Sequence, residues 1–315
     1  MRPTKFSPAL AAAPLLVASL LSLSVGCSPS HFVLKSAADS LSDSSGPSSF
    51  ARDRDPEFVR DAVPFALETM ESLGLKLPDH VGIRVALAAG LTQYGYAFVQ
   101  QPVELGGEAN SEAGKAALAR ATHFYLRARE HGLDGLKIAH GITIEQLRSA
   151  EKDRTKALAS LEKEDVALIY WTLVPWGAAI SLNKRDLELV GDVPVIAALL
   201  DRALTLDESF DQGALHEFSI TFDSARPEGT TPEKEKAHFE RARVLANGEK
   251  ISPLVTYAEA VLGPAQDKKG YQALLNEAAS YDVDQPKARN DRLANVLSQR
   301  RAKFLLAHQS DVFSD

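Results

Sequence analysis

The chain has 315 residues, 45% of them hydrophobic, and a formal net charge of −7. This length is enough for a sizeable buried core. An acidic balance without a basic run argues against nucleic-acid binding, which depends on clustered Lys and Arg. The chain has one cysteine, Cys27, so it cannot form an internal disulfide. Packing must therefore supply the stability.

The first 26 residues have the parts of a secretory signal peptide. Arg2 and Lys5 form a basic start, and an apolar run over 9–25 ends in small residues before Cys27. A lone cysteine there is typical of a bacterial lipobox, although Leu23 stands four residues before it where three is usual. We predict that 1–26 is a lipoprotein signal peptide and that Cys27 carries the lipid. The alternative is an ordinary signal peptide followed by an unrelated cysteine.

Removal of residues 1–26 would take away two basic residues and leave a formal charge of −9. Several acyl chains on Cys27 would hold the protein stably on a membrane. Ser28 follows the cysteine where an Asp would favour retention in the inner membrane, so we expect the periplasmic face of the outer membrane. Residues 27–54 are rich in serine and poor in apolar periodicity, which predicts a flexible tether.

Residues 55–315 are predicted to form a single all-α domain. Asp55, Pro56 and Glu57 combine an N-cap, a proline at the first helical position and an early acid. No run of alternating β-branched residues bounded by turns follows. Loops are expected over 101–110 and 135–141. The predicted helices cover 55–73 (ended by Gly74), 79–101, 111–131 (closed by Gly132), 143–161 (one helix or two short ones), 165–182, 194–206, 208–225, 232–247, 253–262, 268–281 and 287–308.

Residues 166–182 carry no charge and contain both tryptophans, Trp171 and Trp176. The stretch is slightly shorter than the roughly 20 residues of a membrane-spanning helix. A helix that is apolar all round and too short to span is usually buried in a soluble core. We therefore predict the central core helix of the domain, with a bend at Pro175.

A weak repeat of the form bulky-x-x-Ala closes four of the predicted helices. Its last three alanines, Ala203, Ala242 and Ala278, are 39 and 36 residues apart, close to the roughly 34-residue period of tetratricopeptide (TPR) repeats. The pattern predicts a compact, α-solenoid-like array of helical hairpins with cryptic TPR-like repeats. The four pairs are Tyr125 and Ala128, Leu200 and Ala203, Phe239 and Ala242, and Leu275 and Ala278.

The sequence has no recognisable catalytic motif. His216 and Glu217 begin like the zinc-protease motif HExxH, but Ile220 occupies the place of the second histidine. No phosphate-binding loop, nucleophile elbow or dinucleotide fingerprint occurs. We predict that the protein is not an enzyme and binds no metal ion or cofactor.

Aromatic residues and one acid are the candidates for binding. Glu217 lies at the edge of an apolar helical stripe, either paired with Arg202 or Arg226 or at the mouth of an apolar cavity together with His216. We expect Trp171 to be the more core-like tryptophan and Trp176, which small residues follow, to face open space. The candidates for ligand or partner binding are Tyr94, Tyr96, Phe98, Trp171, Trp176, His216, Glu217 and Phe218.

Four segments resemble the TRAP-transporter T-component family of periplasmic lipoproteins. They are GLTQYGYAFVQ (90–100), IYWTLVPWGAAISL (169–182), LDESFDQGALHEFSI (206–220) and NDRLANVLSQRRAKFLLAH (290–308). Their spacing extends the resemblance over roughly residues 55–313.

The resemblance implies a non-enzymatic accessory of a tripartite transporter whose partner is a periplasmic solute-binding protein. It also implies a homotrimer with an apolar tunnel in each subunit, suited to a hydrophobic ligand. The alternative is an outer-membrane-anchored TPR-like scaffold that binds proteins only. A cavity lined by Tyr94, Trp171 and Trp176 would distinguish the two.

Overall fold

The computed structural model describes residues 38–39, 48–226 and 230–313. Every regular element in these ranges is helical and none is a strand, which confirms the all-α class. The α-helices are α2 (Pro56–Lys76), α3 (Val81–Tyr94), α4 (Gln101–Leu105), α5 (Glu112–His140), α6 (Ile144–Arg148), α7 (Glu151–Leu158), α8 (Val166–Leu182), α9 (Leu187–Val190), α10 (Val193–Asp207), α11 (Phe210–Ser224), α12 (Pro232–Ala246), α13 (Ser252–Tyr257), α14 (Lys268–Ala279) and α15 (Arg292–Ala307). Two π-helices, η1 (Gly95–Gln100) and η3 (Ala258–Leu262), and the 3₁₀ turns η2 (Lys163–Asp165), η4 (Pro286–Asp291) and η5 (Gln309–Asp311) complete the described chain.

Helix α8 lies at the centre of the larger hydrophobic core, as predicted. It packs against α3, α5, α10 and α11, and eight of its residues are buried. The segment Lys163–Leu182 is the one helical stretch in the described residues that is long and apolar enough to cross a membrane. Because protein surrounds it on several sides, it is the core helix of this domain.

Helix α5 crosses α8 at two glycines that the sequence assigned to a helix end and a turn. That prediction was wrong, since α5 continues through Gly132 and Gly135 and ends only at Gly141, in the left-handed conformation. A Cβ on Gly132 would lie 2.9 Å from the Cα of Thr172, and one on Gly135 would lie 2.6 Å from Leu168 Cδ1. The glycines are thus places where the two helices approach closely.

Other helix ends follow their local signals, with small shifts. The Asp55 side chain accepts a hydrogen bond from the Phe58 amide at 3.0 Å, so the predicted cap of α2 is confirmed. Gly74 does not end α2, which reaches Lys76. Helix α4 occupies part of the predicted 101–110 loop, since proline is tolerated in the first turn of a helix. The 143–161 segment forms two short helices, α6 and α7.

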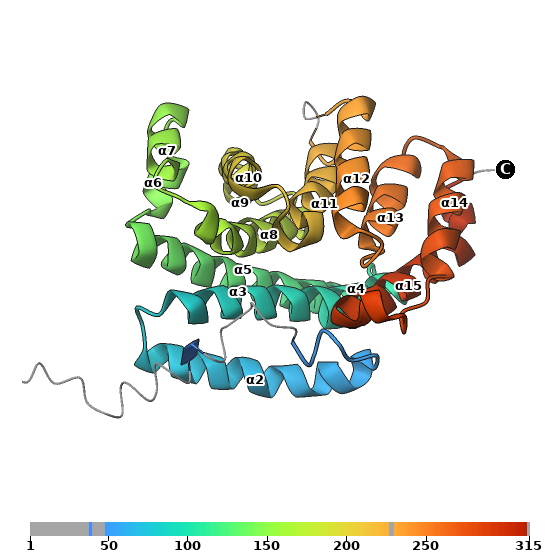
Figure 1. Cartoon of the computed structure of the whole chain (residues 1–315), viewed down its shortest axis with the longest axis horizontal. Coiled ribbons are helices and arrows are strands. Elements are labelled where there is room, and N and C mark those ends of the chain that lie inside the picture. The colour runs from blue at the N-terminus through green and yellow to red at the C-terminus, as the bar shows by residue number, and fades with distance from the viewer. Residues whose placement is uncertain (1–37, 40–47, 227–229, 314–315) are drawn as a thin grey trace, which may run out of the picture.

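The helices are stacked in layers, and the last returns to the first. Figure 1 shows α2, α3 and α5 one above another, with α8 and α10–α13 on the far side of α5 and α15 returning beside α4. Arg300 of α15 binds Glu57 of α2 through both terminal guanidinium nitrogens, at 2.5 and 3.0 Å. The Leu293 amide donates to the Ala51 carbonyl at 3.0 Å. The described chain therefore closes on itself.

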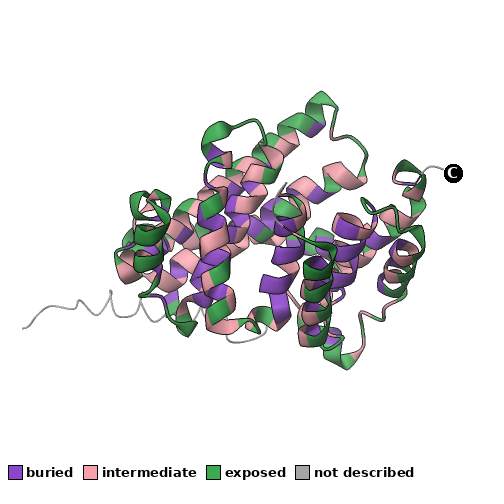
Figure 2. Cartoon of the chain, turned by 90° about the horizontal axis from the view of Figure 1, so that it is seen from above, coloured by how far each residue is buried: buried purple, intermediate pink, exposed green. Residues whose placement is uncertain are grey.

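Buried residues gather on the helix sides that face one another (Figure 2). A second core joins α12–α15 with η3 and includes Tyr257 and Tyr271. All eight residues of the bulky-x-x-Ala pattern are buried, consistent with close helix packing. The TPR-like repeat itself stays a prediction.

The described part of the predicted tether contacts the folded body. Ala38 is buried against Leu77, Ile83 and Leu87, and Asp39 lies 2.9 Å from the His80 ring. Residues 48–54 reach the C-terminal helices, for example through the carbonyl of Ala51. The packed structure thus begins before Asp55.

Candidate functional site

Tyr96 on η1 is partly exposed, although charged groups from four other elements act on it. Burial raises its pKa to about 12, and Glu104, Glu217, Glu259 and Arg301 surround it electrostatically. These four belong to α4, α11, η3 and α15, which are distant in sequence. Nevertheless 42% of the Tyr96 surface is exposed. We call the partly open surroundings of Tyr96 that these elements share the interior space.

Glu217 of α11 also acts on the Tyr96 phenol. Its carboxylate accepts hydrogen bonds from the hydroxyls of Ser252 at 2.8 Å and Thr256 at 2.9 Å, both on α13. Burial raises the pKa of this carboxyl although these hydrogen bonds oppose the shift. The predicted arginine partner was wrong. Arg202 binds backbone carbonyls and Arg226 binds Asp223 instead.

A left-handed turn precedes Glu217 on the same helix. Asp211, Gln212 and Gly213 have φ angles of 43°, 59° and 89°. Such a conformation costs a non-glycine residue about 1–2 kcal/mol. Lys250 holds the turn, because its ammonium group donates to the Asp211 carbonyl at 3.0 Å and carboxylate at 2.6 Å. Strain held by a specific bond is typical of functional sites.

Both π-helices border the interior space. The first, η1, carries Tyr96, and η3 carries Glu259. A π-helix inserts an extra residue into a helical turn and often marks a functional position. Here the two π-helices bring a phenol and a carboxylate toward the same guanidinium, that of Arg301. Sequence periodicity predicted plain helices in both places.

Arg301 is the centre of a partly buried ion cluster. Its guanidinium binds both Glu259 oxygens, at 2.6 and 2.5 Å, and one oxygen of Glu104 at 2.8 Å. Gln100 donates to the other Glu104 oxygen at 2.7 Å, and the Tyr125 hydroxyl donates to Gln100. The cluster links η1, α4, α5, η3 and α15 around the interior space.

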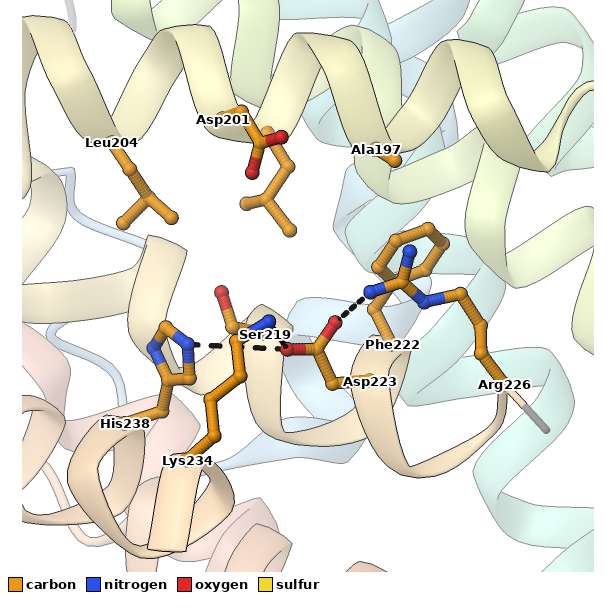
Figure 3. Close-up of a pocket in the computed structure, with 10 residues that line it drawn as sticks. Ala197, Asp201, Leu204, Ser219, Phe222, Asp223, Arg226, Lys234 and His238 are labelled. Atoms are coloured by element: carbon orange, nitrogen blue, oxygen red, sulfur yellow. Dashed lines mark hydrogen bonds and ion pairs between the residues drawn. The ribbon is translucent and has the colours of Figure 1, made fainter. Parts of the chain in front are cut away.

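A separate pocket of about 230 Å³ opens between α10, α11 and α12 (Figure 3). At its floor the Asp223 carboxylate forms ion pairs with Arg226 and with Lys234, whose ammonium nitrogen lies 2.7 Å away. His238 lies 4.0 Å from the same carboxylate. Ala197, Leu200, Leu204 and Phe222 give the pocket an apolar side. Asp223 binds both cations, and Asp201 lines the pocket from α10.

His238, which lines this pocket, contacts His216, and the two rings share one hydrogen between them. His216 Nε2 lies 3.1 Å from the Glu208 carboxylate, which can only accept, so this nitrogen carries hydrogen. Its Nδ1 then accepts from His238 Nδ1 at 2.9 Å. The next proton goes to His238 Nε2, which faces Asp223. Burial lowers the pKa of both histidines.

The two tryptophans have the reverse of the expected environments. Trp176 is fully buried, with the Arg129 guanidinium 5.3 Å from its ring centroid. The ring of Phe218 fills the space expected beside it, because a Cβ on Gly177 would lie 3.0 Å from Phe218 Cζ. Trp171 is only half-buried. It packs edge-on against Tyr170, with ring centroids 4.9 Å apart.

The structure therefore divides the predicted binding residues into three groups. Tyr96 and Glu217 belong to the interior space, whereas Trp171 packs on Tyr170, on whose phenol Glu217 also acts. Tyr94 and Phe98 pack on each other and belong, with Trp176, to the core. His216 belongs to the histidine pair, and half-buried Phe218 stacks on Phe222. Sequence reasoning missed Tyr170 and Arg301, for which no motif gives a signal, and the described residues contain no cluster fit for a metal ion.

Comparison with known proteins gives the family. The sequence model of the TRAP transporter T-component family matches residues 52–313. The chain belongs to this family. An uncharacterized protein of Treponema pallidum (strain Nichols) is 31% identical over 278 residues, which are 87% of this chain and 85% of that protein. The T-component family is one of transporter accessory proteins, so the chain has an accessory role in a TRAP transport system.

Proposed function

We propose that this T-component binds a hydrophobic ligand in its interior space, as a lipid-anchored periplasmic accessory that partners a solute-binding protein. The observation that carries the ligand is Tyr96, an aromatic residue that keeps 42% of its surface exposed although acids and Arg301 from four other elements act on it. The half-buried rings of Trp171 and Phe210 contact the ring of Tyr170, on whose phenol Glu217 also acts. Ligand sites are typically concave and mainly apolar with a few fixed polar groups.

Fluorescence of the two tryptophans tests the ligand. The neutral probe N-phenyl-1-naphthylamine should bind saturably, at one molecule per chain, and quench Trp171. Trp171→Phe should remove most of the quenching, whereas Trp176→Phe, the matched control in the core, should keep it. Absent or unsaturable binding would favour the alternative, a scaffold that binds proteins only.

The partner and the anchor are proposals that rest on the family and the sequence. Co-purification of the solute-binding protein of the same transport system tests the first. The second depends on Cys27, which lies outside the described residues. Labelled palmitate should be incorporated into the wild-type chain, and the product should fractionate with the outer membrane.

A homotrimer is the proposed assembly. On α2, Phe58 and Phe65 are 64% and 81% exposed and lie seven residues apart, on one helix face. Exposed apolar side chains gathered on one face are typical of protein interfaces. Phe65→Ser should shift the sedimentation coefficient of the purified protein toward that of the monomer. A wild-type protein that sediments as a monomer would contradict the proposal.

A further inference from the structure

The pocket between α10, α11 and α12 has charged groups on two facing walls (Figure 3). Its volume of about 230 Å³ lies below the roughly 300–1,000 Å³ typical of sites for drug-sized ligands, so it suits a smaller molecule. The lining contains two acids, Asp201 and Asp223, and two permanent cations, Arg226 and Lys234. A small ligand with a single charge would therefore meet as many like charges as opposite ones.

Asp201 is the acid that stays available to a ligand. It is an exposed residue of α10, and its carboxylate forms no hydrogen bond or ion pair with any described residue. Figure 3 shows this carboxylate directed from α10 toward α11 and α12. On α11, the Ser219 hydroxyl donates to the Leu215 carbonyl at 2.8 Å, so toward the pocket it can only accept. Both groups suit a positively charged donor.

The opposite wall holds two cations that a buried acid positions. The Asp223 side chain is 3% exposed, and its two oxygens accept from Arg226 and from Lys234, the second at 2.7 Å. Each cation has further donors, since an ammonium group has three N–H bonds and a guanidinium group five. Arg226 Nε makes no hydrogen bond to any described residue, and the Lys234 side chain is 50% exposed. These cations can therefore bind a second carboxylate while they stay bound to Asp223.

Apolar side chains complete the lining. Leu200 and Leu204 of α10 and Phe222 of α11 line the pocket, and we call these three the apolar wall. The Arg226 guanidinium carbon lies 4.4 Å from the centroid of the Phe222 ring. This cation–π contact holds the guanidinium beside the apolar wall. A branched alkyl group would bury apolar surface there.

We propose that this pocket binds a zwitterionic α-amino acid with a branched apolar side chain, such as leucine. The ammonium group donates to Asp201, and the carboxylate accepts from Lys234 and Arg226. The alkyl group lies on the apolar wall. None of the residues that line this pocket belongs to the interior space, so the inference holds whether or not a hydrophobic ligand binds there.

Calorimetry on the full chain tests the three contacts with leucine and three analogues. Isocaproate is leucine without the ammonium group, isoamylamine is leucine without the carboxylate, and glycine has no side chain. L-Leucine should bind saturably, at one molecule per chain, and about tenfold more tightly than each analogue, because each analogue loses either a charge-assisted hydrogen bond or the apolar contact.

Two variants assign the charged contacts. Asp201→Asn should weaken the binding of leucine about tenfold and should not weaken that of isocaproate, because the removed charge attracts only the ammonium group. Lys234→Gln should weaken both compounds several-fold. Glu240→Gln, on the same helix as Lys234, is the matched control that should change neither, since Glu240 lies outside the pocket lining and pairs with Lys236 at 3.6 Å.

Leucine that does not bind, or isocaproate that binds as tightly as leucine, would overturn the amino-acid site. An Asp201→Asn protein that is folded by circular dichroism and binds leucine like the wild type would overturn it too. The ranking of the four compounds on the wild type decides the question even if a variant fails to fold.

Discussion

The crossing of α5 and α8 allows a sharp test of the packing. A methyl group on Gly132 would lie 2.3 Å from Thr172 Oγ1 and 2.9 Å from the Thr172 Cα. Alanine in a helix is otherwise better than glycine by about 1 kcal/mol, whereas overpacking a close contact costs about 1–3 kcal/mol. Because a backbone atom cannot rotate away, the helices must separate. We expect Gly132→Ala to lower the free energy of unfolding by about 2 kcal/mol. This is the upper end of the overpacking cost minus the gain from the higher helix propensity of alanine.

Gly135→Ala on the same helix is the matched control. Its methyl group would meet the tip of the Leu168 side chain at 2.6 Å, and a side chain can change its rotamer. This variant should therefore lose less than half as much stability as Gly132→Ala. Guanidinium unfolding followed by circular dichroism measures both. A Gly132→Ala protein as stable as the wild type would refute the close backbone approach.

Three further predictions concern the tryptophans, the histidine pair and the anchor. Trp176→Ala should cost about 3–5 kcal/mol in chemical unfolding because Trp176 is fully buried, and Trp171→Ala clearly less; equal losses would contradict the environments described. Burial lowers the pKa of His216 and His238 from 6.5. The two neutral histidines therefore contribute their full share of the folding free energy above about pH 6.5, and that share is lost as the pH falls toward their lowered pKa values in the folded protein. His238→Gln should accordingly reduce the drop in unfolding midpoint between pH 7.5 and 5.5. Cys27→Ser should leave an unprocessed precursor without labelled palmitate, and normal processing would disprove the anchor.

Local signals predicted much of the fold. The caps, prolines and apolar stripes located most helices, and the uncharged stretch around the tryptophans is the core helix. The role of a glycine was ambiguous in the sequence, because a glycine can either end a helix or let a second helix approach closely. Gly132 and Gly135 have the second role, which depends on Thr172 and Leu168, far away in sequence. Only the assembled helices show which role applies.

The site was less predictable for a related reason. Tyr94 and Tyr96 are two residues apart and look alike in sequence, but one is in the core and the other faces the interior space. The partners of Glu217 are hydroxyls 35 and 39 residues further on, not an arginine. Arg301 joins acids 42 and 197 residues away. Such pairings depend on the tertiary arrangement.

The return of α15 to the first helix has a mechanical consequence. An open array of helical hairpins has two free ends, and a pull on one end peels off a hairpin at a time. Here the Ala51 and Arg52 carbonyls accept hydrogen bonds from α15, and Arg300 binds Glu57 directly after them. Force arriving through a tether ahead of these residues would load both ends of the folded chain together. The bonds would then have to break at once, in shear, before any helix could be drawn out.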